Sequence, residues 1–506
     1  MFKSSLRILL IAVLIGNYMA RAQYEVVGNL ITNFDDYGYG AVSDISDDGN
    51  RIIVSSVDAG SLIGGVKVFE FNTQTNKWEQ LGQNLKGTQS FETFGSTVSI
   101  SGDGGTIAIG SNYRGGAVFT YRLHNGSWTL IRSGILQNGE NFWSFGDRVI
   151  LNTDGSKLIV SGILTEKDER NHSAVMLFKL DKANDTWNQI GDMLEGDVGY
   201  LGADIAANTD FNRIVVGDGE GNVKVYDISA DDRGDIWTQR GNTISYKFNN
   251  YIYSRYGTQL AITDDGNYIV IGEPADLASL AGDDETTLPG YVQAYKFNGK
   301  NWVTDGSKLT YGKGLNNDNF GRSIALDPKG KRLIVAKPKT AGDGLSNATF
   351  YIYNYNGNDW IISEDMLTIN LRDTKHGVSV NMTPDKSRIV VSGEGGVVGI
   401  YQEPKESILG LDNRLNNSDT PTTLYPNPVN NGFTIALDDT AYKGLENRQC
   451  VVEIIDNLGR AVLTKNNISM GNSYYIPTEH LHAGIYFVQI KDIKGSQVYV
   501  KRIAKR

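Results

Sequence analysis

Hydrophobic and polar residues alternate in short runs along most of the chain, a pattern typical of half-buried β-strands. Residues 94–101, FGSTVSIS, and residues 117–121, AVFTY, are two such runs. Turn dipeptides such as Asp103-Gly104 and Asn125-Gly126 lie between the runs. Glycine adopts the positive φ of a tight hairpin without steric cost, so these dipeptides predict antiparallel hairpins. The four expected strands of one unit are named A to D in chain order, with A innermost.

This unit recurs seven times between Tyr24 and Tyr401, with a period of roughly 55 residues. One group of strands per repeat indicates that each unit must stack against its neighbours to bury its apolar faces. We therefore expect residues 23–402 to form an all-β, seven-bladed β-propeller. Each strand A opens on a glycine: Gly40, Gly95, Gly146, Gly202, Gly257, Gly321 and Gly377. Tryptophans at the start of strand D are expected to pack between adjacent blades: Trp78, Trp128, Trp187, Trp237, Trp302 and Trp360.

The two ends of the repeat region complement each other. The seventh unit stops after VVGIY at 397–401 and has no strand D, whereas YEVVGNL at 24–30 resembles WEQLGQNL at 78–85. We expect the first segment to supply the missing strand and to close the ring. Such closure removes two open sheet edges, which otherwise invite aggregation.

The loops differ between the two ends of the blades. The A–B and C–D turns are short, but the B–C loops and D–A crossings vary widely in length, and long variable loops on a rigid scaffold often carry binding residues. Tolerated insertions are the alternative interpretation. Tyr113, Trp143 and Tyr251 are our candidate ligand contacts, because these aromatics fall outside the repeated positions and exposed rings anchor sugars or protein partners.

Residues 1–22 have Lys3 and Arg7, an apolar run and a small-residue cleavage site before Gln23, as expected of a signal peptide. No other stretch has membrane-spanning length, so the mature chain is expected not to span a membrane. The formal net charge is −10, and Cys450 is the single cysteine. The acidity argues against nucleic-acid binding, and one cysteine allows no disulfide within the chain.

After a linker at 403–422, residues 423–506 contain short strands broken by turn residues, as in a small β-sandwich. This segment resembles the type A C-terminal sorting domain of the type IX secretion system, found in Bacteroidetes-type bacteria. The resemblance rests on Tyr425-Pro426-Asn427-Pro428, on Asn457-Leu458-Gly459-Arg460, on Ala483-Gly484-Ile485-Tyr486 and on the basic terminal strand with Lys501. It implies recognition by the type IX outer-membrane translocon, and a secreted or cell-surface protein.

No catalytic residue, metal or cofactor is expected from the sequence. The histidines show no HExxH motif or ligand-like spacing, and the chain has no GxSxG elbow. Loop acids could still form a carboxylate pair, as glycosidase or lyase chemistry requires; these are Glu166, Asp168, Glu169, Asp283, Asp284 and Glu285. We expect a noncatalytic recognition or adhesion propeller for a glycan or a surface protein, and a glycan-active enzyme is the alternative.

Overall fold

The computed structural model is all-β, and every regular element among the described residues is a strand. The chain divides into two compact units, Met1–Glu403 and Pro404–Arg506, which are described separately. The signal peptide predicted at 1–22 and nearly all of the linker predicted at 403–422 lie outside the described residues. The structure describes residues 24–32, 39–56, 63–88, 93–112, 115–136, 142–164, 172–196, 204–218, 221–229, 236–245, 259–273, 290–310, 319–338, 346–371, 378–393, 397–403, 422–425, 431–437, 449–456, 461–469, 473–482, 484–492 and 497–505.

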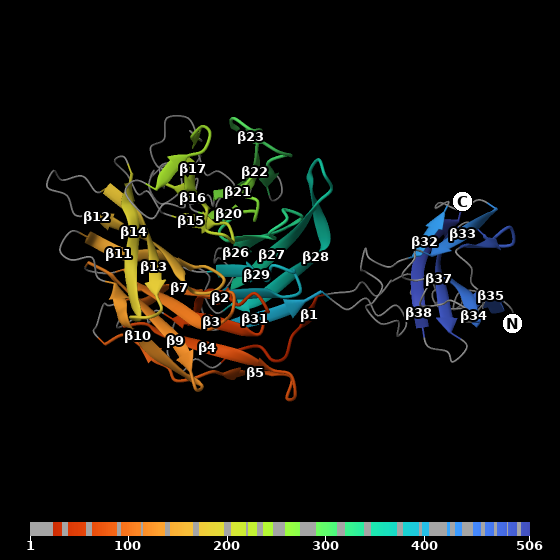
Figure 1. Cartoon of the computed structure of the whole chain (residues 1–506), viewed down its shortest axis with the longest axis horizontal. Coiled ribbons are helices and arrows are strands. Elements are labelled where there is room, and N and C mark those ends of the chain that lie inside the picture. Colours follow the sequence, from red (N-terminus) through yellow and green to blue (C-terminus); the bar gives the residue numbers. More distant parts are fainter. Residues whose placement is uncertain are drawn as a thin grey trace, which may run out of the picture. The chain divides into compact units, whose positions relative to one another are not determined.

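The described residues of the first unit form seven antiparallel sheets of four or five strands, numbered here in chain order (Figure 1). Sheet 1 contains β2 (Tyr39–Ile45), β3 (Arg51–Ser56), β4 (Gly65–Asn72), β5 (Lys77–Gln80) and β6 (Leu85–Lys86). Sheet 2 contains β7 (Phe94–Ile100), β8 (Thr106–Ser111), β9 (Ala117–His124) and β10 (Ser127–Leu136). Sheet 3 contains β11 (Phe142–Leu151), β12 (Lys157–Leu164), β13 (His172–Asp181) and β14 (Thr186–Glu195).

The remaining sheets repeat this order. Sheet 4 contains β15 (Asp204–Ala207), β16 (Arg213–Gly217), β17 (Asn222–Ile228), β18 (Trp237–Gln239) and β19 (Ile244–Ser245). Sheet 5 contains β20 (Gln259–Ile262), β21 (Tyr268–Glu273), β22 (Tyr291–Phe297), β23 (Trp302–Thr304) and β24 (Leu309–Thr310). Sheet 6 contains β25 (Ile324–Leu326), β26 (Arg332–Pro338), β27 (Ser346–Tyr355) and β28 (Trp360–Leu371). Sheet 7 contains β29 (Val378–Met382), β30 (Ile389–Gly393), β31 (Val397–Gln402) and the N-terminal β1 (Glu25–Val26).

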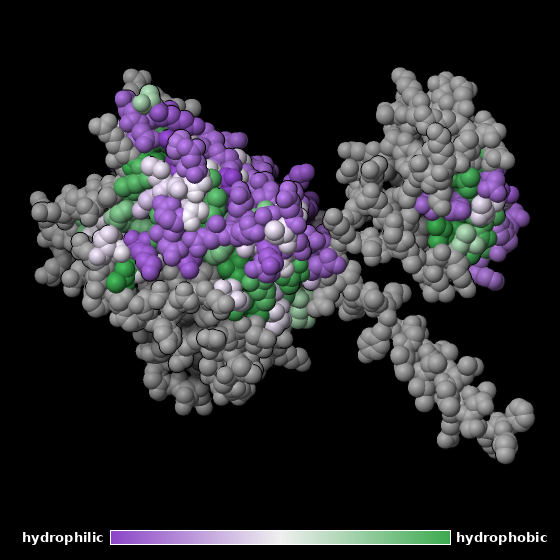
Figure 2. Space-filling view, turned by 90° about the horizontal axis from the view of Figure 1, so that it is seen from below, coloured by the Kyte–Doolittle hydropathy of each residue, from purple (hydrophilic) through white to green (hydrophobic). Residues whose placement is uncertain are grey.

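Apolar side chains from consecutive sheets interlock. One buried cluster joins Ile53 and Val66 of sheet 1 to Ile107 of sheet 2, and further clusters join each later sheet to the next. Another cluster joins Val390 of sheet 7 to Ile52 of sheet 1. Burial of apolar surface on both faces of each sheet is the main force that holds the unit together. The described surface in Figure 2 is mostly hydrophilic, with smaller hydrophobic patches.

β1 pairs with β31, so that Glu25 lies opposite Gln402 and Val26 opposite Tyr401. An isolated bridge between Ile31 and Val398 extends this pairing. The N-terminal segment 24–32 therefore occupies the outer position of sheet 7, where the sequence has no strand D of its own.

The strand-D tryptophans are buried between sheets, as predicted. Each indole N–H donates a hydrogen bond to the preceding sheet; the Trp128 indole, for example, bonds the Leu81 carbonyl at 3.0 Å. The Trp128 backbone N–H also bonds Gln83 Oε1 at 3.0 Å. Trp78 makes the same pair of bonds to the Val27 carbonyl and Asn29 Oδ1, both at 2.9 Å, and thus links sheet 1 to the N-terminal segment.

A glycine makes this contact possible. Gly82 has φ of +78°, and a Cβ placed there would lie 2.7 Å from Trp128 Cδ1. The same positive-φ glycine interrupts the outer strand of sheet 1, so the expected single strand D is split into β5 and β6. Sheets 4 and 5 have the same split.

The predicted A–B turns have the expected chemistry. Gly49, Gly104, Gly155 and Gly266 all have positive φ. In the first turn, Asp48 Oδ1 accepts hydrogen bonds from Ser46 Oγ at 2.6 Å and from the Asn50 N–H at 2.9 Å. Arg51 then reaches the next sheet and donates to the Gly104 carbonyl at 3.1 Å.

The first strand of each sheet is its inner edge, and side chains satisfy N–H groups along these edges. Asp44 Oδ2 accepts from the Ile100 N–H at 3.0 Å. Ser99 Oγ accepts from the Leu151 N–H at 3.1 Å. Ser323 Oγ accepts from the Val380 N–H at 3.1 Å. Asn381 of sheet 7 donates to the Ser43 carbonyl of sheet 1. These bonds join neighbouring sheets at their inner strands.

Among the described strand-A glycines, Gly95 and Gly146 lie at bulges, and Gly321 lies just before β25. Gly95, Gly146 and Gly321 have φ of +93°, +88° and +91°. A Cβ at Gly95 would approach Ser55 and Val66 of the preceding sheet at 3.0 Å. Glycine is needed here both for the backbone conformation and for close packing between sheets. Gly202, Gly257 and Gly377 lie outside the described residues, and of Gly40 the structure describes only the backbone.

The C-terminal unit contains two antiparallel sheets. The smaller sheet contains β32 (Thr422–Tyr425), β33 (Gly432–Leu437) and β36 (Ser473–Pro477). The larger sheet contains β34 (Gln449–Asp456), β35 (Ala461–Ser469), β37 (Gly484–Asp492) and β38 (Gln497–Lys505). One apolar core joins Phe433 and Ile476 of the first sheet to Val452, Val488 and Ile503 of the second, as in a small β-sandwich.

Candidate functional site

The candidate ligand contacts are predicted to lie in the B–C loops and D–A crossings, at one end of the strands. Tyr113 and Tyr251 lie outside the described residues. Trp143 lies in β11, where the structure describes its backbone, between the buried Phe142 and the fully buried Phe145. The loop acids Glu166, Asp168, Glu169, Asp283, Asp284 and Glu285 also lie outside the described residues. The roles of these residues as ligand contacts or as a carboxylate pair therefore stay predictions.

A cluster of polar side chains does lie at this end of the inner strands, and we term it the inner polar cluster. Asn112 directly follows β8, at the start of the B–C loop of sheet 2. Ser144, Asp147 and Arg148 lie in β11 of sheet 3. Asp204 is the first residue of β15 in sheet 4. The cluster thus contains side chains from three consecutive sheets.

A β-bulge positions the central pair. The register between β11 and β12 shifts between Phe145 and Arg148, next to Gly146 with its φ of +88°. A bulge leaves an extra residue in one strand and changes the direction of the following side chains, and bulges are frequent beside binding sites. Asp147 and Arg148 are consecutive in the sequence, and both are half-buried.

Both oxygens of the Asp147 carboxylate accept hydrogen bonds from protein groups. Ser144 Oγ donates to Oδ2 at 2.6 Å, and Asn112 Nδ2 donates to Oδ1 at 3.0 Å. The Asn112 carbonyl oxygen in turn accepts from Thr93 Oγ1 at 3.0 Å. The orientations of the Asp147 and Asn112 side chains are therefore fixed before any ligand binds.

Arg148 continues the network toward the next sheets. Its Nε donates to Asp204 Oδ1 at 3.0 Å, and its Nη1 donates to the Asp147 carbonyl at 3.0 Å. Asp204 Oδ2 accepts from the Leu260 N–H of sheet 5 at 2.7 Å. The Arg148 side chain is 37% exposed, and its Nη2 has no partner among the described residues. This guanidinium can therefore donate further hydrogen bonds to a ligand.

Burial shapes the electrostatics of the cluster. Burial raises the pKa of Asp147 above its usual value, while the donors Ser144 and Asn112 and the nearby Arg148 act in the opposite direction. Burial likewise raises the pKa of Asp204, against the effect of Arg148. Carboxyl groups with raised pKa values are over-represented at functional sites, although structural networks produce them too.

The sequence analysis missed this cluster. A local signal was present, because Asp147-Arg148 places a charged pair directly after the strand-A glycine. The corresponding dipeptides in sheets 1 and 2 are Ala41-Val42 and Ser96-Thr97. The repeat pattern identifies residues that all units share. The cluster instead depends on residues that differ between units, such as Asp147 and Arg148.

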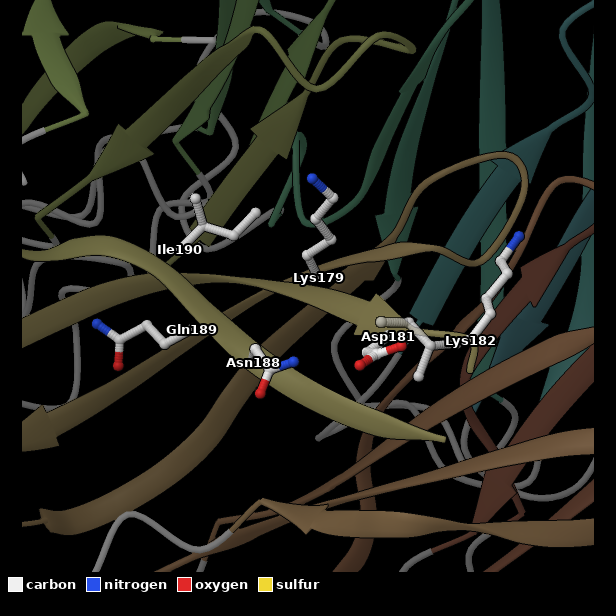
Figure 3. A pocket seen from close by; sticks show the side chains of 7 residues that line it. Lys179, Asp181, Lys182, Asn188, Gln189 and Ile190 are labelled. Atoms are coloured by element: carbon white, nitrogen blue, oxygen red, sulfur yellow. The ribbon is translucent and has the colours of Figure 1, made fainter. Parts of the chain in front are cut away.

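A separate shallow hollow of ≈ 460 Å³ lies on the β13–β14 hairpin of sheet 3 (Figure 3). Its lining is Lys179, Leu180, Asp181, Lys182, Asn188, Gln189 and Ile190. Lys182 Nζ lies 3.4 Å from Asp154 Oδ2, and both side chains are well exposed. Figure 3 shows the two lysine side chains extending away from each other, so they do not converge on one ligand position.

Among the described residues, no group of three or more His, Cys, Asp and Glu side chains is arranged to hold a metal ion. Within the same residues, no helix has the length and apolar character needed to cross a membrane.

The sorting-motif residues lie on the strands of the C-terminal unit or just beyond the described residues. Tyr425 ends β32, Gly484 begins β37, and Lys501 lies in β38 opposite Val488. Tyr486 is buried, and its hydroxyl donates to the His482 carbonyl at 3.0 Å. Pro426, Asn427, Pro428 and Gly459 lie outside the described residues.

Comparison with solved structures gives distant similarities. Kuenenia stuttgartiensis hydrazine synthase matches with a TM-score of 0.48 and 14% identity, covering 76% of this chain and 99% of that chain. The Cps50 (Swd1) β-propeller domain of Myceliophteria thermophila matches with a TM-score of 0.44 and 12% identity, covering 74% of this chain and 99% of that chain. No curated protein matches the sequence.

The family comparison is specific for the end of the chain. Residues 423–506 match the model of the secretion system C-terminal sorting domain. This match confirms the resemblance drawn from the Tyr425, Gly459 and Gly484 motifs, and such a domain implies interaction with the type IX secretion system. Residues 423–506 are therefore a type IX secretion C-terminal sorting domain, and the protein is secreted or attached at the cell surface.

Proposed function

We propose that residues 23–402 form a closed seven-bladed propeller that acts as a noncatalytic recognition or adhesion module at the cell surface. Its ligand is a glycan or a surface protein, and its binding face is the end that carries the long loops. The sorting domain brings the propeller to the cell surface, where such ligands occur.

Closure is supported by the junction between sheets 7 and 1. Val27 and Ile31 of the N-terminal segment share one apolar cluster with Val398 and Ile400 of β31 and with Trp78 of sheet 1. The first strands β2 and β29 also contact each other, as do the first strands of the other consecutive sheets. A ring in which each sheet is a blade accounts for both sets of contacts.

The single observation that favours recognition is that protein donors hold the two carboxylates of the inner polar cluster in fixed orientations. Every oxygen of Asp147 and Asp204 accepts a hydrogen bond from a protein donor. Preorganised hydrogen-bonding groups of this kind suit the binding of a ligand.

The raised pKa values of Asp147 and Asp204 favour a second candidate, a glycan-active enzyme. A raised pKa favours the protonated form of a carboxyl group, and a protonated carboxyl group can act as a general acid. The two candidates differ in outcome, because an enzyme releases shorter products whereas a recognition module leaves its ligand intact.

The test uses the exported full-length protein on glycan and peptide arrays, together with assays for polysaccharide turnover. We expect binding without product release. A variant with alanine at Tyr113, Trp143 and Tyr251 should lose the array signal while it keeps the melting temperature of the wild type. Product release from a bound polysaccharide would contradict the noncatalytic proposal, and full binding by the triple variant would contradict the assignment of these contacts.

A further inference from the structure

The inner polar cluster has a defined chemical character that narrows the class of ligand. It contains an amide, a buried hydroxyl, a guanidinium and two carboxylates, which belong to Asn112, Ser144, Arg148, Asp147 and Asp204. With both carboxylates ionised, the formal charge of this set is −1. The two carboxylates would repel an anionic ligand more than the one guanidinium attracts it. A cationic ligand would be repelled by the guanidinium, which lies near both carboxylates.

Neutral hydroxyl groups fit this arrangement better than either ion does. A sugar hydroxyl both donates and accepts hydrogen bonds, so adjacent hydroxyls can donate to a carboxylate and accept from a guanidinium. Asp147 and Arg148 are neighbours in β11, and Arg148 Nη2 points to no partner among the described residues. Each carboxylate oxygen retains a second acceptor site beyond the bond that it already makes.

The cluster is also accessible and rigid. The Arg148 side chain is 37% exposed, and Asn112 and Asp147 are half-buried, so a ligand can reach these three residues. Their positions are fixed by bonds that span sheets 2 to 5, from Thr93 to the Leu260 N–H. Fixed donors and acceptors lose little conformational entropy when a ligand binds. More of the free energy of the new hydrogen bonds therefore contributes to affinity.

The geometry points to Asn112, Asp147 and Arg148 as the hydrogen-bonding part of a binding site for a neutral glycan. This inference rests on the proposed recognition function and specifies its ligand. Asp204 serves as a positioning residue, because its carboxylate holds the Arg148 guanidinium beside Asp147.

The experiment measures binding of the full-length protein to an array of neutral oligosaccharides, including glucans, mannans, xylans and galactans. Anionic alginates and pectins and a peptide array serve as contrasts. We expect Arg148→Gln to weaken neutral-glycan binding by about tenfold or more, because a charge-assisted hydrogen bond is lost. Asp147→Asn keeps the size of the side chain and should weaken binding as well.

Arg51→Gln is the matched control. Arg51 also pairs with a carboxylate, Glu70, and also reaches a neighbouring sheet, but it lies beside the A–B turns at the other end of the sheets. We expect this variant to bind like the wild type. Melting temperatures of all three variants distinguish loss of the site from loss of the fold.

The outcomes separate the two levels of the proposal. Full glycan affinity in folded Arg148→Gln and Asp147→Asn variants, or a preference for anionic polysaccharides, would overturn this inference. Binding to peptides with no binding to neutral glycans would overturn it and leave the recognition function standing. No binding on either array would overturn both.

Discussion

At the scale of single residues, several carboxylates act as connectors between neighbouring sheets. Asp44 illustrates the cost of this role: its carboxylate is buried so that it can accept the Ile100 and Ile45 N–H groups and the Ser99 hydroxyl. Burial and, to a smaller extent, the nearby Asp47 raise the pKa of Asp44, these hydrogen bonds lower it, and the net result is a pKa of about 6 against an ordinary value of 3.8. Burial of Asp44 is therefore less favourable when its carboxyl group is ionised, and the hydrogen bonds offset only part of this cost.

This pKa shift gives a pH-dependent prediction. Because the folded-state pKa is raised, the contribution of Asp44 to stability is fully present below 3.8 and is lost as pH rises through about 6. The stability of the wild type relative to Asp44→Asn should therefore fall between about pH 4 and about pH 6 and then level off, as measured by chemical denaturation. Asp48→Asn is the control, because hydrogen bonds lower the pKa of Asp48 and its contribution changes only at more acidic pH. A difference between wild type and Asp44→Asn that stays constant over this range would contradict the assignment.

At the scale of elements, the recurring device is the contact between a strand-D tryptophan and the preceding sheet. It combines a buried indole, two hydrogen bonds and a glycine that lets the chains approach. The tryptophan alone was predictable, since its position repeats in the sequence. Its partners were not, because Gln83 and Leu81 lie more than forty residues away and each unit supplies partners for the following one.

The chain offers a matched pair of glycines to test this device. Gly82 and Gly126 have φ of +78° and +76°, but a Cβ at Gly82 would lie 2.7 Å from Trp128 whereas a Cβ at Gly126 would contact nothing within 4 Å. Alanine at Gly126 should cost about 1 kcal/mol of unfolding free energy from backbone strain. Alanine at Gly82 should cost at least about 1 kcal/mol more, because the indole must move. Equal losses of unfolding free energy in the two variants, measured by denaturant unfolding, would show that the contact between Gly82 and Trp128 does not limit the residue at position 82.

At the scale of the whole first unit, the junction between its first and last strands is the feature to test. Val27 is 5% exposed and packs between sheets 7 and 1, whereas its neighbour Val26 is 43% exposed. Val27→Ala should destabilise the unit by about 1–3 kcal/mol through loss of buried contacts. Val26→Ala should change its stability by less than about 0.5 kcal/mol. A thermal or denaturant transition that is equally sensitive to both substitutions would argue against this junction.

The sequence was informative where a short motif determines the structure. The Asp-Gly turns, the alternating strands and the resemblance of residues 24–30 to 78–85 all depend on local composition and repetition. The sorting domain was predictable for the same reason, because its motifs are local. The split outer strands of sheets 1, 4 and 5 were not foreseen, since the role of Gly82 depends on a tryptophan in the next sheet.

The candidate site was harder to predict than the fold. The aromatic candidates came from loops, where repetition gives no guidance, while the inner polar cluster forms from residues in three sheets. Asn112 and Asp147 are 35 positions apart, and Arg148 and Asp204 are 56 apart. Only the stacking of consecutive sheets brings these side chains within hydrogen-bond distance.

The position of β1 has a consequence for the life of the protein. Sheet 7 needs both the first described strand and residues up to Gln402, and the sorting domain begins shortly afterwards at 423. A chain released from the ribosome before Gln402 would lack part of sheet 7 and all of the sorting domain. Any chain that contains the sorting domain therefore already contains every strand of the first unit. Because the sorting domain is synthesised last, only chains with a complete set of these strands can be exported through it.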